Sequence, residues 1–498
     1  MSVRDYMFIA RLLLCLPFLL QPVMALDETQ IQFYEALEVA SAEGIPSLIG
    51  KLDALVKNAP SSSFAPYVHE TIQIVGLLHP GSVPDRVARL ESLKASAAGN
   101  PGLARVLKRV EILQSYYAAA TQGHPESASA ALSDPVLEGS PYGMQALADA
   151  ALRARDYGKA AALAYQVIEN DPYSPLLSNA YMVLGLSSAF RGDSKSALIH
   201  FQRALAVSAL PTIYGNPRDY VFTAYRFSRP VPAAVGEIFD EVLSTRVADG
   251  TGLKDPQALI SSNKGYILLD KETILTVSSD GRILDKKPAR RIEDIAATRD
   301  GKIYTITDEQ IDLGSGSVAT LSLTVGKKTK RITKLRSLTV DARGDIYFLD
   351  QDLGILRSDA TVKAGSLSIA EFAPVKGRLI RADGWGNLYV LSPDQRSILI
   401  LAKDGKQLGS LQADPVAGKL GLIEYFALDS LNHIYILEDN SIQIFAMISS
   451  GAGFEKKRVG LYALDPRPQF RNLRVLGVNA TGELVTTGKN EDNWVYFK

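Results

Sequence analysis

The stretch LRSLTVDARGDIYFL, residues 335–349, determines the fold class of the second half of this 498-residue chain. In it, Asp341 and Gly344 mark a turn between two runs that are rich in apolar and β-branched residues. Glycine adopts, at little cost, the positive φ that a tight turn between strands requires. The stretch therefore predicts two antiparallel strands joined by a tight turn.

The same pattern returns five more times before the chain ends. The turn residues are Gly265, Gly301, Gly344, Gly386, Asn432 and Gly482, separated by 36, 43, 42, 46 and 50 residues. Asparagine is the other residue that tolerates the left-handed region. Three positions before the turn residues stand Ser262, Thr298, Asp341, Asp383, Asp429 and Asn479. The last four can close an Asx turn, so six turn-linked β units are predicted.

Each unit has room for four strands in about 40 residues, which is the size of a β-propeller blade. Third strands are expected at 397–401, 441–445 and 494–497. The last unit ends on its third strand, so we expect 244–248 to pair with 493–498 as its fourth strand. The pattern hydrophobic-x-x-Asp-x-x-Gly-x-Ile-Tyr-Val resembles the NHL repeat. That resemblance implies a six-bladed β-propeller over 246–498.

The first half has helical periodicity instead, with Pro and Gly turns between segments of about a dozen residues. In 141–208, Gly185 and Ala197 supply small residues where two helices of a hairpin would meet, and Phe201 supplies a large one. This spacing resembles the tetratricopeptide (TPR) family. The resemblance implies an α-helical hairpin solenoid over 26–245. The predicted fold class is multidomain α + β, a TPR-like solenoid followed by an all-β six-bladed propeller.

The concave face of such a solenoid is lined mainly by the first helix of each hairpin. In the two clearest copies these helices carry polar and apolar side chains that suit an extended peptide or a partner helix. The residues are Gln145, Asp149, Arg153, Asn179, Met182, Leu186 and Phe190. The alternative is that they pack against the next hairpin or the propeller.

The first 25 residues have the features of a signal peptide. Arg4 and Arg11 give a positive start, 12–20 is a short apolar run, and Ala25 ends a sequence suited to cleavage. An N-terminal membrane anchor is the alternative. The chain has one cysteine, Cys15, within this segment. The mature chain would then have no thiol, which suits an oxidising compartment. We expect a periplasmic or secreted protein that is not integral to the membrane after signal removal.

The overall charge gives no reason to expect a nucleic-acid partner. The chain has 54 Lys plus Arg and 54 Asp plus Glu, so the formal net charge is zero. A basic field that attracts phosphate backbones is therefore not expected. The basic run at 327–331 is interpreted as a solvated loop or as lysines that protect a strand edge.

The histidine and acidic residues are the candidates for metal binding and catalysis. The five histidines, His69, His79, His124, His200 and His433, form no pair at metal-binding spacing. Calcium could bind in the channel of a propeller hydrolase through carboxylates. The candidates are Asp270, Asp350, Asp383 and Glu438, with ordinary solvated turn residues as the other interpretation. We predict no cofactor, no metal and no catalytic residue.

Three functions remain open at this point. The first is a non-catalytic scaffold of the bacterial envelope that binds a protein or peptide partner through the solenoid groove and the propeller face. The second is a calcium-dependent, lactonase-like propeller hydrolase. The third is a propeller mouth that binds carbohydrate or lipid head groups.

Overall fold

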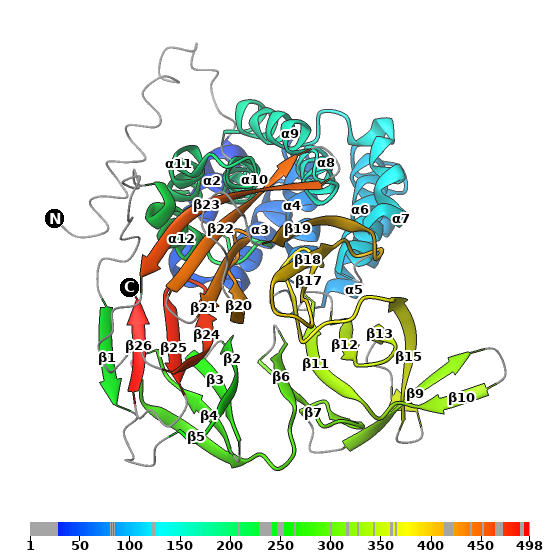
Figure 1. The fold of residues 1–498 in the computed structure, drawn as a ribbon. Coiled ribbons are helices and arrows are strands. Elements are labelled where there is room, and N and C mark those ends of the chain that lie inside the picture. The colour runs from blue at the N-terminus through cyan, green and yellow to red at the C-terminus, as the bar shows by residue number, and fades with distance from the viewer. Residues whose placement is uncertain are drawn as a thin grey trace. The chain divides into compact units, whose positions relative to one another are not determined.

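A computed structural model gives the fold, which consists of a helical region followed by a β-propeller (Figure 1). The structure describes residues 28–497 except 80, 82, 84, 122–124, 173, 208–209, 229–241, 247–252, 263–264, 272, 280, 299–300, 315–317, 326–327, 342–343, 359–361, 364–365, 413–421, 439–440, 451–452, 464–471 and 489–492. The predicted signal peptide lies outside the described residues. Among the described helices, none combines the length and the apolar character that crossing a membrane requires.

The chain divides into two compact units. The first comprises Met1–Ala189 and Asp193–Val221, and the second comprises Phe190–Gly192 and Phe222–Lys498. The sequence predicted a boundary at 245/246, later than this division. A strand that spans the predicted boundary, residues 242–246, pairs within the propeller.

Eleven α-helices are seen in the described part of the chain. They are α2 (Glu28–Glu43), α3 (Ile45–Asn58), α4 (Ala65–Leu78), α5 (Arg86–Ala97), α6 (Pro101–Thr121), α7 (Pro125–Ser129), α8 (Pro141–Arg153), α9 (Tyr157–Asn170), α10 (Leu177–Phe190), α11 (Ser194–Ala206) and α12 (Pro217–Ser228). Asp156 and Asp193 cap α9 and α11 by accepting bonds from the backbone amides three residues on. The α10–α11 hairpin packs as the sequence predicts, since a Cβ at Gly185 would lie 2.3 Å from the ring of Phe201.

The propeller has six blades of antiparallel strands. Blade one is β2 (Pro256–Ser262), β3 (Gly265–Asp270), β4 (Thr273–Val277) and β5 (Ile283–Pro288); blade two is β6 (Asp294–Ala297), β7 (Ile303–Ile306), β8 (Gln310–Asp312) and β9 (Val318–Val325); blade three is β11 (Leu335–Val340), β12 (Ile346–Asp350), β13 (Gly354–Ser358) and β15 (Ser366–Ala373). Blade four is β16 (Leu379–Ala382), β17 (Leu388–Leu391), β18 (Ser397–Leu401) and β19 (Gln407–Gln412); blade five is β20 (Ile423–Leu428), β21 (His433–Glu438), β22 (Ser441–Ser450) and β23 (Gly453–Ala463). The first strand of each blade is the inner strand, and the six inner strands contact one another in a closed ring.

Blade six confirms the predicted ring closure. Its strands are β24 (Leu473–Val478), β25 (Leu484–Gly488), β26 (Asn493–Phe497) and β1 (Val242–Arg246). The register pairs Ser244 with Val495, so the strand before blade one completes the last blade. The strand begins two residues earlier than predicted. Both edges of β26 are thereby paired, which leaves no exposed ladder at the C-terminal strand.

Blades two and three depart from the predicted pattern of separate blades. Their outer strands β9 and β15 pair in parallel over Thr320–Leu323 and Ser366–Ile369, and this pairing joins the blades into one sheet. Two short strands are added, β10 (Lys328–Arg331) on β9 and β14 (Val362–Lys363) on β15. Residues 328–331 of the basic run thus form a strand, and Arg331 pairs with Glu309 at 3.0 Å.

The turns after the inner strands have the predicted backbone. Positive φ is found at Gly265, Gly301, Gly344, Gly386, Asn432 and Gly482, from 63° at Asn432 to 129° at Gly265. The Asx turns are also formed, as when Asp341 Oδ1 accepts the amide of Asp345. Thr298 closes the corresponding turn in blade two, where its Oγ1 accepts the amide of Lys302. A hydroxyl can therefore replace the expected carboxylate in this turn.

Candidate functional site

The channel formed by the inner strands is the candidate site. In each blade we call the residue three before the turn glycine or asparagine the turn-start residue. The backbone amides of five turn-start residues donate to carbonyls at the start of the second strand of their blade, as Asp383 does to Asn387. The five are Thr298, Asp341, Asp383, Asp429 and Asn479. In an antiparallel pair, only every second residue of a strand directs its backbone amide toward the partner strand. The amides one and three positions before each turn-start residue therefore point away from the second strand and toward the channel. Such unpaired groups need partners when they are buried.

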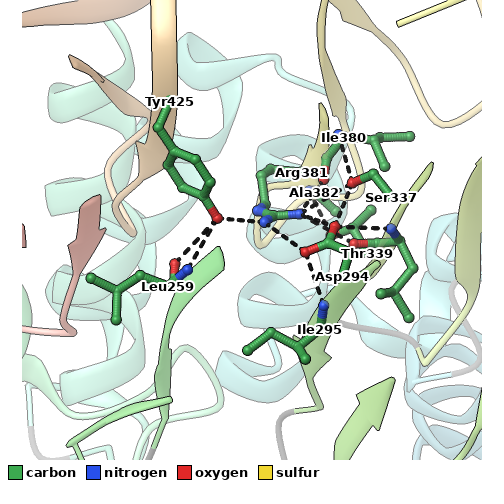
Figure 2. A network of polar contacts seen from close by, with 10 residues as sticks. Leu259, Asp294, Ile295, Ser337, Thr339, Ile380, Arg381, Ala382 and Tyr425 are labelled. Atoms are coloured by element: carbon green, nitrogen blue, oxygen red, sulfur yellow. Dashed lines mark hydrogen bonds and ion pairs between the residues drawn. The ribbon is translucent and has the colours of Figure 1, made fainter. Parts of the chain in front are cut away.

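Arg381 and Asp294 form an ion pair inside this channel (Figure 2). The two side chains come from β16 and β6, which belong to blades four and two. Nη1 donates to Oδ2 at 3.0 Å and Nη2 donates to Oδ1 at 3.2 Å. The Arg381 side chain is 11% exposed and that of Asp294 is 2% exposed. This fork-to-fork geometry is the strong form of an arginine–carboxylate contact.

Tyr425 extends the pair toward blade one. Arg381 Nη2 donates to the Tyr425 hydroxyl at 2.6 Å, and the ring centroid lies 5.5 Å from the guanidinium carbon. The same hydroxyl accepts the backbone amide of Leu259 at 3.3 Å. On the other side, Ser337 of blade three donates its hydroxyl to Asp294 at 2.5 Å. The cluster therefore links the inner strands of blades one to five.

The cluster caps the inward-facing amides of four blades. Leu259 donates to Tyr425, while Ile295 and Leu338 donate to the two oxygens of Asp294. The fourth amide, from Ile380, donates to Ser337 Oγ at 3.1 Å. One more amide, closer to the turns, is capped when Ala382 donates to Thr339 Oγ1 at 3.0 Å. The cluster thus satisfies the exposed inner edges of the sheets, which are otherwise unpaired strand edges.

The charges of the cluster reinforce one another. Burial alone would lower the pKa of the Arg381 guanidinium, but the carboxylate of Asp294 and the hydroxyl of Tyr425 raise it above its ordinary value. Burial also raises the pKa of the Tyr425 hydroxyl, so this side chain stays neutral near pH 7. The channel floor is therefore a closed, charge-balanced crossbar, which is the name used below for Arg381, Asp294, Tyr425 and Ser337.

A cavity of about 150 Å³ lies in the channel and has Arg381 in its wall. Inner strands from all six blades line it, mainly with small or aliphatic side chains such as Ala297, Val340 and Ala427. These side chains are half-exposed, whereas Asp294 and Ser337 in the crossbar are buried. The cavity is therefore a shallow cup whose open end is where the inner strands finish.

The four carboxylates that the sequence offered as calcium ligands are each bound within their own blade. Asp270 accepts the amides of Lys254 and Asp255, and Asp350 accepts those of Asp352 and Leu353. Asp383 binds the turn amides of Trp385 and Asn387, and Glu438 accepts from Ser441 and Gln443. All four are buried rather than solvated, so that part of the prediction was wrong. Each one is bonded to groups of its own blade.

The polar residues predicted for the solenoid face form buried contacts. Asp149 is fully buried and accepts the hydroxyls of Tyr116 at 2.7 Å and Tyr214 at 2.8 Å. Arg153, 33% exposed, donates Nε to the same carboxylate at 2.7 Å. Burial and the charge of Asp149 raise the pKa of both phenols. Asp149 is thus the centre of a polar core rather than an open surface group.

The other predicted residues of that face are also away from solvent. Asn179 Oδ1 accepts the amide of Ile213, and Met182, Leu186 and Phe190 are at most 2% exposed. Gln145 is 1% exposed. The packing interpretation accounts for these positions, because buried side chains have no surface to offer a partner. A binding role for Gln145, Asp149, Arg153, Asn179, Met182 and Phe190 stays a prediction.

The described residues hold no group of three or more His, Cys, Asp or Glu side chains that could bind a metal ion. His433 contacts Asp429 Oδ2 through Nδ1 at 2.8 Å. Burial lowers the pKa of His69, His79 and His200. His124 lies outside the described residues. His200 and His433 are buried among other side chains.

Comparisons with known proteins give only distant likenesses. No family model matches this chain, and no curated protein matches it. Virginiamycin B lyase from Staphylococcus aureus is 15% identical over 50% of this chain and 81% of its own, with a TM-score of 0.31. A gluconolactonase from Xanthomonas campestris is 15% identical over 54% and 98%, with a TM-score of 0.36. The extracellular domain of a hybrid two-component system from B. thetaiotaomicron is 11% identical over 52% and 42%, with a TM-score of 0.36. Likeness at this level carries no argument about activity.

Sequence reasoning missed the crossbar. Asp294 stands four positions before the turn-start residue of blade two, where the other blades have Ala258, Ser337, Leu379, Tyr425 and Val475. Each of the six turn-start residues has an equivalent position two residues before it, and Arg381 is the charged side chain among those six positions. Aligning the six copies column by column would have shown both charges at inward-facing positions. That alignment is the signal that could have found them.

Proposed function

We propose that this chain is an exported, non-catalytic binding protein of the bacterial envelope that engages a protein or peptide partner. The observation that carries the proposal is the Arg381–Asp294 pair in the channel. At the place where a catalytic propeller would gather unpaired acid, base or metal ligands, this chain has a charge-neutralised and largely buried structural cluster. Export is inferred from residues 1–25, and the partner class from two units that resemble TPR and NHL repeats.

The hydrolase alternative is opposed by electrostatics. A calcium ion in the channel would lie close to the guanidinium of Arg381, and like charges repel strongly where water is excluded. The carboxylate best placed to bind such an ion is Asp294, which already holds Arg381 and two amides. The other candidates are bonded within their own blades. Binding calcium would require breaking several of these contacts.

The carbohydrate alternative has less support than the peptide one. Sugar rings commonly stack on aromatic faces, which supply apolar contact and leave the hydroxyls free to bond. The side chains that line the cup are aliphatic or small, apart from Ser261, Thr339 and Arg381. An aliphatic peptide side chain matches such walls better than a polyhydroxylated ring does.

The test combines metal analysis with partner capture. The purified chain is measured for bound calcium by mass spectrometry and titrated with calcium in a calorimeter. It is then used to capture a partner from envelope extract, and the captured protein is produced recombinantly and rebound. We expect no stoichiometric calcium and a reconstituted complex. Stoichiometric calcium together with lactone hydrolysis would contradict the proposal.

A further inference from the structure

The cup above the crossbar has an incomplete set of backbone caps. In blade three, Thr339 stands two positions before the turn-start residue and caps the inward amide of Ala382 in the next blade. The equivalent positions of the other five blades hold Ile260, Ala296, Arg381, Ala427 and Gly477. Arginine has no acceptor, and the remaining side chains have no polar atom. The Thr339 cap is therefore not repeated around the ring.

Five inward amides are left without such a cap. They belong to Ser261, Ala297, Val340, Leu428 and Val478, one from each blade except the fourth. The alternation of the ladder directs these amides away from the second strand of each blade and toward the channel. All five residues line the cup. Because antiparallel pairing directs the amide and the carbonyl of such a residue to the same side, the wall offers both donors and acceptors.

The size and polarity of the cup limit what can fill it. A cavity of about 150 Å³ holds a group the size of one small ring or one aliphatic residue. The wall is aliphatic between the backbone groups, and the single charge, on Arg381, is already balanced by Asp294. A charged ligand group would lose its hydration without gaining a free counterion. The best match is a neutral group with an aliphatic body and amide hydrogen-bonding groups on either side.

We infer that the cup binds one aliphatic residue of a partner peptide, with the flanking peptide groups bonded to the uncapped backbone of the inner strands. This inference rests on the proposed function and names the chemistry of its ligand. Specificity comes from the wall in two ways. The backbone groups select an uncharged peptide, and the small side chains Ala297, Ala427 and Gly477 leave room for a valine-sized side chain.

The test uses N-acetylvaline methylamide as the probe, observed by saturation-transfer NMR with the full chain. Ala427→Leu and Ala297→Leu each place a larger side chain in the cup, and Ala370→Leu makes the same change on an exposed position of β15. Tryptophan fluorescence monitors folding of the variants. We expect the probe to bind the wild type and Ala370→Leu equally, and to bind at least one folded cup variant about tenfold more weakly or not at all.

Two comparison compounds test the ligand class. Isovalerate carries the same aliphatic group with a charge, and N-acetylglucosamine is a neutral sugar. Preferential binding of either one in a manner sensitive to Ala427→Leu would overturn the peptide assignment. Probe binding that persists in both folded cup variants, or no probe binding at all, would overturn the cup as the site. If the recombinant partner still binds in that case, the proposed function stands and only this inference fails.

Discussion

The two units of this chain each bury a carboxylate with an arginine, but they assemble the pair in different ways. In the helical unit, Asp149 meets Arg153 one helical turn away on α8. In the propeller, Asp294 meets Arg381 across 87 residues and between two blades. The first pair forms wherever the helix forms. The second forms only when blades two and four are placed around the channel, so it reports on the tertiary structure of the propeller.

The same comparison shows a difference in desolvation. Arg153 is one-third exposed and Arg381 is 11% exposed. Removing the carboxylate would leave Arg153 partly hydrated by water, whereas Arg381 would keep an unpaired buried charge. The propeller pair is therefore expected to be the more sensitive of the two. The two tryptophans, Trp385 and Trp494, both lie in the propeller, so fluorescence follows that unit while circular dichroism at helical wavelengths follows the other.

The largest expected effect comes from opening the ring. Deleting 494–498 removes β26, the strand that pairs with both β25 and β1, and it removes the buried side chains of Trp494 and Phe497. We expect cooperative loss of the propeller while the helical signal is retained. Protease resistance and circular dichroism measure the outcome. A truncated chain with a native propeller digestion pattern would show that closure does not depend on this strand.

Next in size is Asp294→Ala. This change leaves Arg381 without its counterion and leaves the amides of Ile295 and Leu338 without acceptors. We expect a loss of about 3–5 kcal/mol in the free energy of unfolding of the propeller. Urea unfolding followed by tryptophan fluorescence gives the value. Asp285→Ala, on an exposed carboxylate of β5, is the control and should change stability by less than about 0.5 kcal/mol.

Asp149→Ala is the matching change in the helical unit. It removes the acceptor of Tyr116, Tyr214 and Arg153, and we expect a loss of about 1–3 kcal/mol in the stability of that unit. Urea unfolding followed by circular dichroism measures it. A larger stability loss for Asp149→Ala than for Asp294→Ala would contradict this comparison. It would mean that the exposure of the arginine does not determine how sensitive each ion pair is to loss of its carboxylate.

The smallest expected effects concern the blade turns. A Cβ at Gly344 meets no atom within 4 Å, but its φ is 90°, so Gly344→Val should cost about 1–3 kcal/mol through backbone strain alone. Asn432, with φ of 63°, already occupies the left-handed region, and Asn432→Gly should be neutral or stabilising. Thermal unfolding of both variants, read by fluorescence, checks the pair. Equal tolerance would mean that the repeat turns do not require positive φ.

Much of the fold could be predicted because its determinants are local and repeated. The turn residues from Gly265 to Gly482 fix the blade units, and the missing fourth strand of blade six implied the closure by β1. The parallel pairing of β9 with β15 could not be predicted. It depends on where two outer strands of different blades lie in space, and no turn or periodicity in the sequence encodes that position.

The candidate site was harder to predict than the fold. Asp270, Asp350, Asp383 and Glu438 drew attention because they recur near strand ends, but their oxygens accept hydrogen bonds from groups of the same blade. The residue that matters most in the channel, Arg381, has its partner in another blade. A single sequence shows which side chains point inward only after the strand register is known. Contacts between distant blades therefore had to come from the structure.

A double-mutant cycle on Arg381 and Asp294 tests the central claim most directly. The variants are Arg381→Met, Asp294→Asn and the two combined, and the free energy of unfolding of the propeller is measured by tryptophan fluorescence in urea. If the pair is a coupled crossbar that closes the channel, each single change destabilises the propeller. The double variant should then be more stable than the sum of the two losses predicts, by about 1–3 kcal/mol. Losses that add to within about 0.5 kcal/mol would contradict the crossbar, because the two side chains would then act independently.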